Sequence, residues 1–322
     1  MPATMPAATD IASLTSSVGA VGRPFGAVLA VAALAYLAAA LVPAWRAWGT
    51  RALAVLVGLL VAGEATLVWF HVRLWQLAVV VDPVTGQAIG RVAVPPWVES
   101  EKLYVWALAL GVLLLCARRH SDELRRTGSI LLLLLVVGAL VSGRPFTDPL
   151  PDFLAQYGAY LRAMGSGSAQ AASGAFQGMA GSMTYYYNAW YMWVHPPLLF
   201  LSYGAFALSF LAALQAAWHR RASFEKTAYR WARFGYLPLT AGMLLGLPWA
   251  ILAWTGEAWW WSGKVNMSIM MWLLYTAYLH LRLYLPRRGM WRWVLGLAFV
   301  SFAALVLTYV TTYVVPGAHS VA

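Results

Sequence analysis

Long apolar runs alternate with short polar connections along this chain, and the alternation predicts its fold. About eight runs are long enough to cross the ~30 Å hydrocarbon core of a bilayer as helices, at ~1.5 Å of rise per residue. They cover 25–44, 52–72, 103–117, 129–143, 191–217, 236–254, 267–285 and 293–315. The third and fourth need flanking residues to span. We therefore expect an all-α, polytopic membrane helix bundle.

Two connections are long. The first, 73–102, contains the turn signal DPVTGQ. The second, 144–190, has a small and polar middle, GSGSAQAASGAFQGMAG, which is typical of a mobile outer loop. The segment Met1–Gly22 has no basic region before its first apolar run and is interpreted as a short tail rather than a cleaved signal.

No boundary between domains is visible. The expected organisation is a single integral membrane domain over 1–322, with a four-helix part (1–143), the outer loop (144–190) and a C-terminal part (191–322). The chain is 61% hydrophobic and 10% charged, with a mean hydropathy of +0.67. These values exclude an ordinary soluble globular domain.

The positive charge is arranged to set topology. A net charge of +11 would suggest nucleic acid for a soluble protein, but 15 of the 22 Lys and Arg residues lie in or beside four short connections between apolar runs. We therefore expect no nucleic-acid partner. The positive-inside rule places those connections on the inner side and both termini on the outer side. The single Cys excludes an intrachain disulfide and a multi-Cys metal site.

The densest aromatic stretch is Trp249–Lys264, WAILAWTGEAWWWSGK, on the expected outer side. Tryptophan favours membrane–water interfaces, but an ordinary belt spreads its Trp over many helix ends. This density predicts a flat apolar platform for a large planar ligand, with a dense interfacial belt as the simpler alternative. The platform residues would be Trp254, Trp259, Trp260 and Trp261.

Two histidines share the depth of this stretch. His195 lies at the outer start of 191–217, and His319 lies just past the outer end of 293–315. A haem iron with two axial imidazoles needs them from separate elements on opposite faces of the ring. His195 and His319 are therefore candidate iron ligands of an outer haem b. A solvated side chain at a helix end is the alternative for each.

A third histidine, His280, lies 14 residues beyond Asn266 and therefore about 21 Å further inward. An ionisable residue within a membrane is a functional candidate by default. His280 is a candidate ligand of a second, inner haem b, or a neutral His hydrogen-bonded between helices, and both remain open. His71 is interpreted as an interfacial anchor or a spare ligand, and Glu64 needs a partner that the sequence does not identify.

Three motifs in this order resemble the haem-handling proteins of cytochrome c maturation, the CcsA (ResC) family, and more distantly CcmF. WAILAWTGEAWWWSGKV resembles the family loop W-A-x-E-A-W-G-x-Y-W-x-W-D-P-K-E, and WLLYTAYLHLR resembles W-L-x-Y-A-x-Y-L-H-x-R. WYMWVHPPLLFLSYGAF and TYVTTYVVPGAHSVA look like the two external histidine helices. The resemblance is clearest over about 185–322.

This resemblance implies roles for the histidines. His195 and His319 match the external pair that holds haem, and His280 matches a transmembrane ligand whose counterpart comes from the partner protein CcsB. The implied function is to present haem for covalent attachment to apocytochrome c, in a multi-pass protein of the bacterial inner (plasma) membrane. No catalytic residue is predicted, because positioning supplies the catalysis. Whether the chain is part of a cytochrome c–haem synthase (lyase) stays open.

The chain departs from the family in its Trp-rich loop. The family's Asp-Pro-Lys-Glu is Ser262-Gly263-Lys264-Val265 here, so both carboxylates are lost. Lys264 remains as a candidate partner for a haem propionate. The change leaves an alternative function, a haem b electron-transfer subunit of a respiratory complex without ligation activity. A transporter without haem is a third class, but no repeated halves support it.

Overall fold

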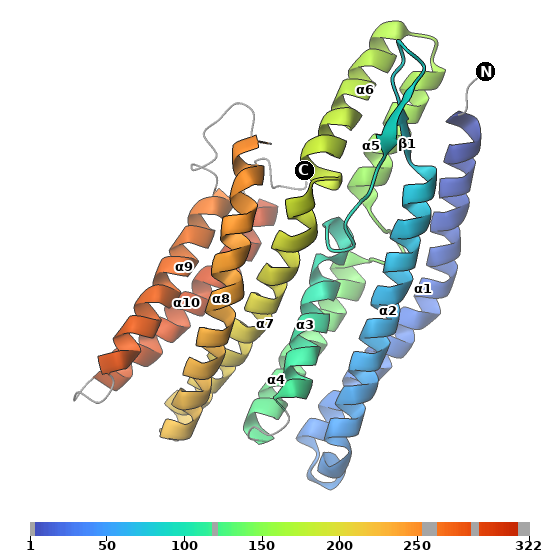
Figure 1. The fold of residues 1–322 in the computed structure, drawn as a ribbon. Helices are drawn as coiled ribbons and strands as arrows, with labels where there is room; N and C mark the ends of the chain where they lie inside the picture. The colour runs from blue at the N-terminus through green and yellow to red at the C-terminus, as the bar shows by residue number, and fades with distance from the viewer. Residues whose placement is uncertain (1–3, 118–121, 253–262, 285–289, 315–322) are drawn as a thin grey trace.

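A bundle of long helices forms most of the molecule, and a small cap lies at one end of it (Figure 1). The cap consists of the hairpin 79–91 and the helical segment 151–187. The computed structural model describes residues 4–117, 122–252, 263–284 and 290–314. The bundle helices are α1 Thr4–Leu41, α2 Gly49–Leu77, α3 Lys102–Cys116, α4 Asp122–Gly138, α7 Trp190–His219, α8 Ala222–Leu252, α9 Gly263–Leu281 and α10 Met290–Val314. The predicted helical, polytopic membrane fold is confirmed.

Each of the eight apolar runs corresponds to one bundle helix, but not all of these helices meet the criteria for a membrane span. Within the described residues, six helices are long and apolar enough to cross a bilayer. They are Thr9–Leu41, Pro43–Leu77, Asp122–Gly143, Trp190–His219, Ala222–Leu252 and Met290–Thr311. The α3 helix has only 15 residues, and α9 carries Asn266 and His280 near its two ends. The expectation that all eight helices cross the membrane therefore remains a prediction.

The expected N-terminal tail is helical. The α1 helix begins at Thr4, so the interpretation of Met1–Gly22 as a tail is wrong over the described part. Ile11 and Val18, seven residues and about two turns apart, are both buried in the core of the cap. Packing against the cap therefore extends α1 beyond the apolar run that predicted it.

The expected outer loop also folds. Residues 144–190 contain α5 (Pro151–Gly165), α6 (Ala169–Ser182) and a π-helical turn, Met183–Tyr187. Ser168 caps α6, since its Oγ accepts a hydrogen bond from the Ala171 N–H at 3.3 Å, and Met179 is fully buried beneath it. Small residues were interpreted as a mobile loop, but Ala is a strong helix former once a cap and an apolar anchor are present.

The connection before α3 contains the exception to the all-α expectation. Strands β1 (Val79–Val81) and β2 (Ala88–Arg91) pair antiparallel, with Val80 opposite Gly90. The predicted turn lies between them, where the Asp82 N–H donates to the Gln87 carbonyl at 2.9 Å. The Tyr160 hydroxyl, from α5, bonds both backbone groups of Val81. The hairpin is thus a part of the cap rather than an isolated ribbon.

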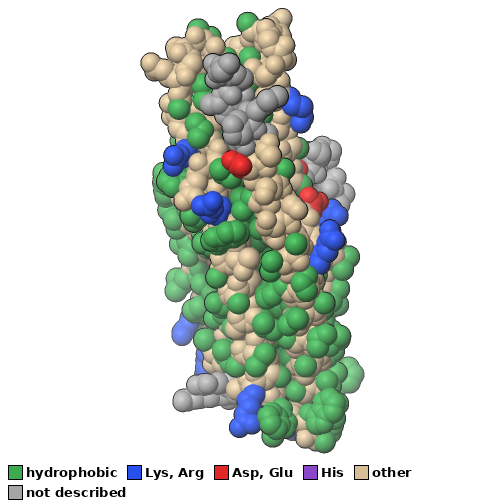
Figure 2. All heavy atoms as spheres, turned by 90° about the vertical axis from the view of Figure 1, so that its right-hand side faces the viewer, with side chains coloured by type: hydrophobic (Ala, Val, Ile, Leu, Met, Phe, Trp, Pro, Cys, Tyr) green, Lys and Arg blue, Asp and Glu red, His purple; other side chains and the backbone are tan. Residues whose placement is uncertain are grey.

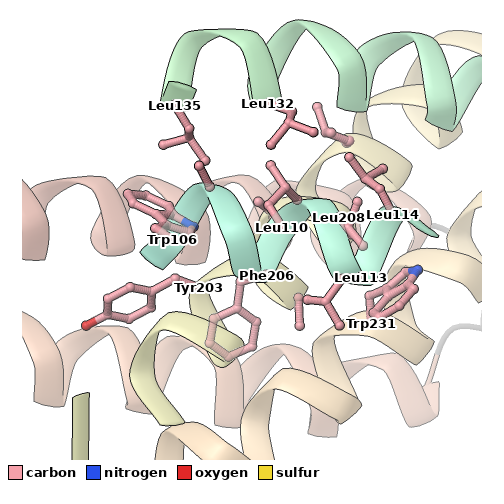
Figure 3. Packing of buried hydrophobic residues seen from close by; sticks show 14 of the residues in the cluster. Trp106, Leu110, Leu113, Leu114, Leu132, Leu135, Tyr203, Phe206, Leu208 and Trp231 are labelled. Carbon is pink, nitrogen blue, oxygen red and sulfur yellow. The ribbon is translucent and has the colours of Figure 1, made fainter. Parts of the chain in front are cut away.

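A continuous apolar core joins the two halves of the bundle. Figure 3 shows α3 at its centre, with Leu132 and Leu135 of α4 on one side and Tyr203, Phe206 and Leu208 of α7 on the other. The helices α8, α9 and α10 pack beyond α7 (Figure 1). The head of α7, where His195 lies, is therefore supported by the cap above it and by α8 beside it.

The outer surface fits a bilayer. Figure 2 shows apolar side chains over the long lower part of one face and Lys and Arg at its lower end. Exposed aliphatic residues on α1 and α2 include Val28, Val31, Leu34, Val55, Val61 and Val68. At the end opposite the cap, Arg46, Arg125 and Arg126 line one small pocket. Arginines from two separate connections thus meet at one end, as the charge pattern predicted.

Candidate functional site

The imidazole of His195 is oriented by the backbone of a neighbouring helix. Its Nδ1 lies 2.6 Å from the Gly242 carbonyl oxygen on α8. Because a carbonyl only accepts hydrogen bonds, Nδ1 carries a proton, which in a neutral ring is the Nδ1–H tautomer. This tautomer, held by a backbone carbonyl, is the one that second-shell contacts select in metal-binding histidines.

Two glycines on α8 make this contact possible. A Cβ added at Gly246 would lie 2.6 Å from His195 Cε1 and 2.7 Å from Nδ1. A Cβ at Gly242 would lie 2.9 Å from Leu199 Cδ2. Only glycine therefore allows α7 to approach α8 this closely. The sequence analysis did not single out these residues, although the Gly-x-x-x-Gly spacing is visible in the sequence.

A cavity of about 260 Å³ opens beside the His195 ring between α7, α8 and α9. Aliphatic and methionine side chains dominate its walls. The lining residues are His195, Leu199, Tyr203, Leu239, Met243, Leu244, Gly246, Leu247, Ala250, Val265, Ser268, Ile269 and Met271. An apolar cleft with one well-oriented polar group is typical of a cofactor site.

The predicted platform and the second predicted outer ligand lie outside the described residues. The residues concerned are Trp254, Trp259, Trp260, Trp261 and His319. Their flanks are described: α8 ends at Leu252 and α9 begins at Gly263, and Ala250 and Val265 both line the cavity. The Trp-rich stretch is thus joined at both ends to the walls of the His195 cavity. Lys264, expected in the loop, lies in the first turn of α9.

His280 is in the last turn of α9, 12 residues and about 18 Å along the helix from the cavity residue Ser268. The structure therefore does not bring it together with His195. Its side chain is exposed, and its Nδ1 donates to the Thr276 carbonyl of its own helix at 2.8 Å. The predicted alternative to haem binding was a hydrogen bond between helices, whereas this bond lies within one helix.

His71 is neither an interfacial anchor nor a spare ligand. It is 5% exposed, and both ring nitrogens are engaged, with the Val94 carbonyl and with Glu101 Oε1, each at 2.7 Å. The sequence did not indicate this ion pair because its partners lie 23 and 30 residues away. Glu64 was expected to need a partner, and its buried Oε2 atom has no hydrogen-bond partner among the residues that the structure describes.

Comparison with known proteins identifies the family. Residues 94–319 match the family described as Cytochrome C assembly protein. The chain belongs to this family. The match includes the whole of α7 to α10, and therefore His195, His280 and position 319.

Several curated relatives of this cytochrome c assembly protein are similar over part of their length. CycK of Bradyrhizobium diazoefficiens is 34% identical over 136 residues, which are 40% of this chain and 20% of the relative. NrfE of Escherichia coli K12 is 38% identical over 128 residues, which are 38% of this chain and 22% of the relative. CcmF of Pseudomonas aeruginosa is 33% identical over 119 residues, which are 35% of this chain and 18% of the relative. All three names are those of cytochrome c-type biogenesis proteins.

The matched part of the chain spans about a fifth of the length of these relatives. No solved structure matches. The comparisons therefore establish a membrane protein of cytochrome c biogenesis, and the chemistry of its site has to be argued from the residues of this chain.

Proposed function

We propose that this chain binds haem b in the His195 cavity and presents it at the outer face for covalent attachment to apocytochrome c. The main supporting observation is the His195 imidazole, whose Nδ1 is held by the Gly242 carbonyl at the wall of an apolar cavity. Because the chain belongs to the cytochrome c assembly family, we infer that the ligand of this cavity is haem.

The residues of the cavity fit a porphyrin. Leu239, Met243 and Ile269 provide an apolar wall for the ring and exclude water from it. His195 and His319 would hold the haem iron. The Trp-rich stretch that connects Ala250 to Val265 would carry the platform, and Lys264 would pair with a propionate.

The contribution of the protein is positioning. The vinyl groups of haem and the thiols of the apocytochrome supply the bond-forming chemistry. The chain holds the iron through a fixed imidazole and orients the ring against a rigid helix pair. Such positioning lowers the entropic barrier to the reaction without any nucleophile or base from the protein.

A second, inner haem would use His280. Its imidazole is exposed at the surface of α9, so a further ligand of that haem would come from another chain. We propose a CcsB-like membrane partner, or another maturation subunit, in the bacterial inner membrane. Both termini would then lie outside the cytoplasm.

The test is the haem b content of purified protein carrying His195→Gly, measured as the pyridine haemochrome. We expect a loss on the order of tenfold that added imidazole partly restores, because imidazole can replace the missing ligand. His219→Gly, at the opposite end of α7, is the matched control and should keep wild-type content. Absence of haem b from the wild type, or an unchanged spectrum in His195→Gly, would refute the proposal.

The rate of haem exchange distinguishes a role in haem attachment from a role in electron transfer. The electron-transfer role is favoured by Ser262 and Val265, which stand where the family loop has carboxylates. A ligation subunit should release its outer haem to apomyoglobin within the time of an assay. An electron carrier should retain it and co-purify with other redox subunits.

A further inference from the structure

The buried residues His71 and Glu101 share a proton and lie outside the His195 cavity. The Val94 carbonyl accepts from His71 Nδ1 at 2.7 Å, so Nδ1 carries a hydrogen. His71 Nε2 and Glu101 Oε1 are also 2.7 Å apart, and one hydrogen must lie between them. Either an imidazolium donates to a carboxylate, or a carboxylic acid donates to a neutral imidazole. In both forms the pair holds one proton more than neutral His plus carboxylate.

Among the described residues, the ionisable groups that interact with the pair are acidic. Glu64 faces the pair from α2, and the Tyr104 hydroxyl of α3 lies near Glu64 while donating to the Leu60 carbonyl at 2.8 Å. Glu101 is fully buried, and the Oε2 atoms of Glu64 and Glu101 are buried without hydrogen-bond partners. Carboxyl groups in such a site favour a bound proton. Lys102, next in sequence, interacts with Glu99 and Asp152 instead.

The pair anchors the segment 94–101, here called the strap, to the outer end of α2. The strap in turn contacts the head of α7. Trp97 Nε1 donates to the Met192 carbonyl at 2.8 Å, and its ring meets Trp193 edge to face at 5.9 Å. Met192 can accept this bond because Pro196, four residues later, has no N–H to satisfy its carbonyl. The strap therefore connects His71 to residues within one turn of His195.

We propose that the His71–Glu101 pair is a proton-binding site that holds the strap in place, and that its protonation controls the position of the head of α7. The control of bound haem rests on the function proposed above. With the proton present, both nitrogens of His71 are satisfied. Its loss places the Nε2 lone pair opposite a carboxylate lone pair in a buried site, and this repulsion releases the strap. The strap is thus held at low pH and released as the pH rises.

The test is amide hydrogen exchange of the strap at about pH 6 and about pH 10 in intact protein, corrected for the intrinsic pH dependence of exchange. We expect wild-type protection to fall by at least about tenfold between the two pH values. In Glu101→Gln the amide N–H donates to neutral Nε2, so the bond survives without a titrating proton. Glu99 also lies in the strap and has a pKa raised to about 7 by burial, so both proteins are compared in a Glu99→Gln background. There the protection of Glu101→Gln should be equal at both pH values.

A second variant covers the case in which Glu101→Gln does not fold. His71→Gln can donate to the carboxylate of Glu101 without a shared proton and should also lose the pH dependence. Equal wild-type protection at both pH values would overturn the proton site. So would a parallel loss of protection in the wild type and in whichever variant folds.

The coupling to α7 has its own readout. The absorption spectrum of bound haem should change with pH in the wild type and not in Glu101→Gln. Trp97→Phe removes the bond to Met192 while keeping most of the ring, so strap exchange should stay pH-dependent while the haem spectrum loses its dependence. A chain without haem would refute the proposed function and leave the exchange result standing. Haem present with a pH-independent spectrum, beside pH-dependent exchange, would refute only the coupling.

Discussion

His195 Nδ1 and the Gly242 carbonyl oxygen lie 2.6 Å apart and join two helices that are consecutive in the chain. The acceptor is a backbone group in the interior of α8. The orientation of the ring therefore depends on how closely α7 and α8 pack. Changes in the distance between α7 and α8 should alter ligand geometry without touching the histidine.

Gly246→Ala tests this dependence. The added Cβ would lie 2.6 Å from His195 Cε1, so the imidazole has to move. We expect haem affinity to fall on the order of tenfold and the folded state to lose about 1–3 kcal/mol. Haem titration and thermal unfolding in detergent measure the two effects. Gly296→Ala on α10, where an added Cβ meets nothing within 4 Å, is the control. It should leave haem affinity unchanged and should not lower stability, because Ala is the better helix former. Equal effects of the two substitutions would contradict the role of Gly246.

His280 is predicted to bind haem only with a partner. Its exposed imidazole offers one ligand, and the cavity residue Ser268 is about 18 Å away along α9. We expect His280→Ala to remove a haem from the co-purified complex and to leave the isolated chain unchanged, as measured by low-spin absorption. A bis-histidine inner haem in the isolated chain, lost in both His280→Ala and His219→Ala, would show that the site is complete in one chain.

The cap should lose stability as the pH rises through neutrality. Glu99 accepts hydrogen bonds from the backbone N–H groups of Asp152 (3.0 Å) and Phe153 (3.2 Å) at the start of α5. Burial, and then repulsion by Asp152, raise the pKa of Glu99 from 4.5 to about 7. Because the folded state binds this proton more tightly, the stabilisation is complete below the unfolded pKa and is lost as the pH rises through about 7.

Glu99→Gln removes this titration while keeping an acceptor for α5. We expect a higher melting temperature than wild type above pH 7, by on the order of 2–4 °C, and a smaller slope between about pH 5 and 7. Thermal scans over that range provide the measurement. Glu123→Gln, at the far end of the bundle, should retain the wild-type slope. An unchanged slope in Glu99→Gln would assign the pH dependence to another group.

Chemical labelling of the native cysteine tests the predicted membrane topology. Cys116 is exposed at the end of α3, next to an Arg-rich connection. If that end faces the cytoplasm, a membrane-impermeant maleimide should label Cys116 only after the membrane is permeabilised. Thr85→Cys in a Cys116→Ala background places a thiol in the hairpin turn and should be labelled in intact cells. The reverse pattern would put both termini and the cap inside.

The sequence by itself determined the fold class, the membrane setting and the family. Apolar runs of bilayer length predict helices, since a backbone in lipid has to satisfy its own hydrogen bonds. The motifs around His195 and Trp254 were sufficient to indicate cytochrome c biogenesis, which the family comparison confirms. These features are local: each is read from the composition or spacing of one short stretch.

Tertiary structure decided the features that depend on contacts between distant residues. The helices of the cap form because residues such as Met179 are buried against other segments, which the small-residue composition of α6 does not reveal. His71 was interpreted as an interfacial residue because its partner Glu101 lies 30 residues away. The tautomer of His195 depends on Gly242, 47 residues later, and on how closely two helices approach. Sequence patterns record which residues are apolar, whereas packing determines which polar groups meet.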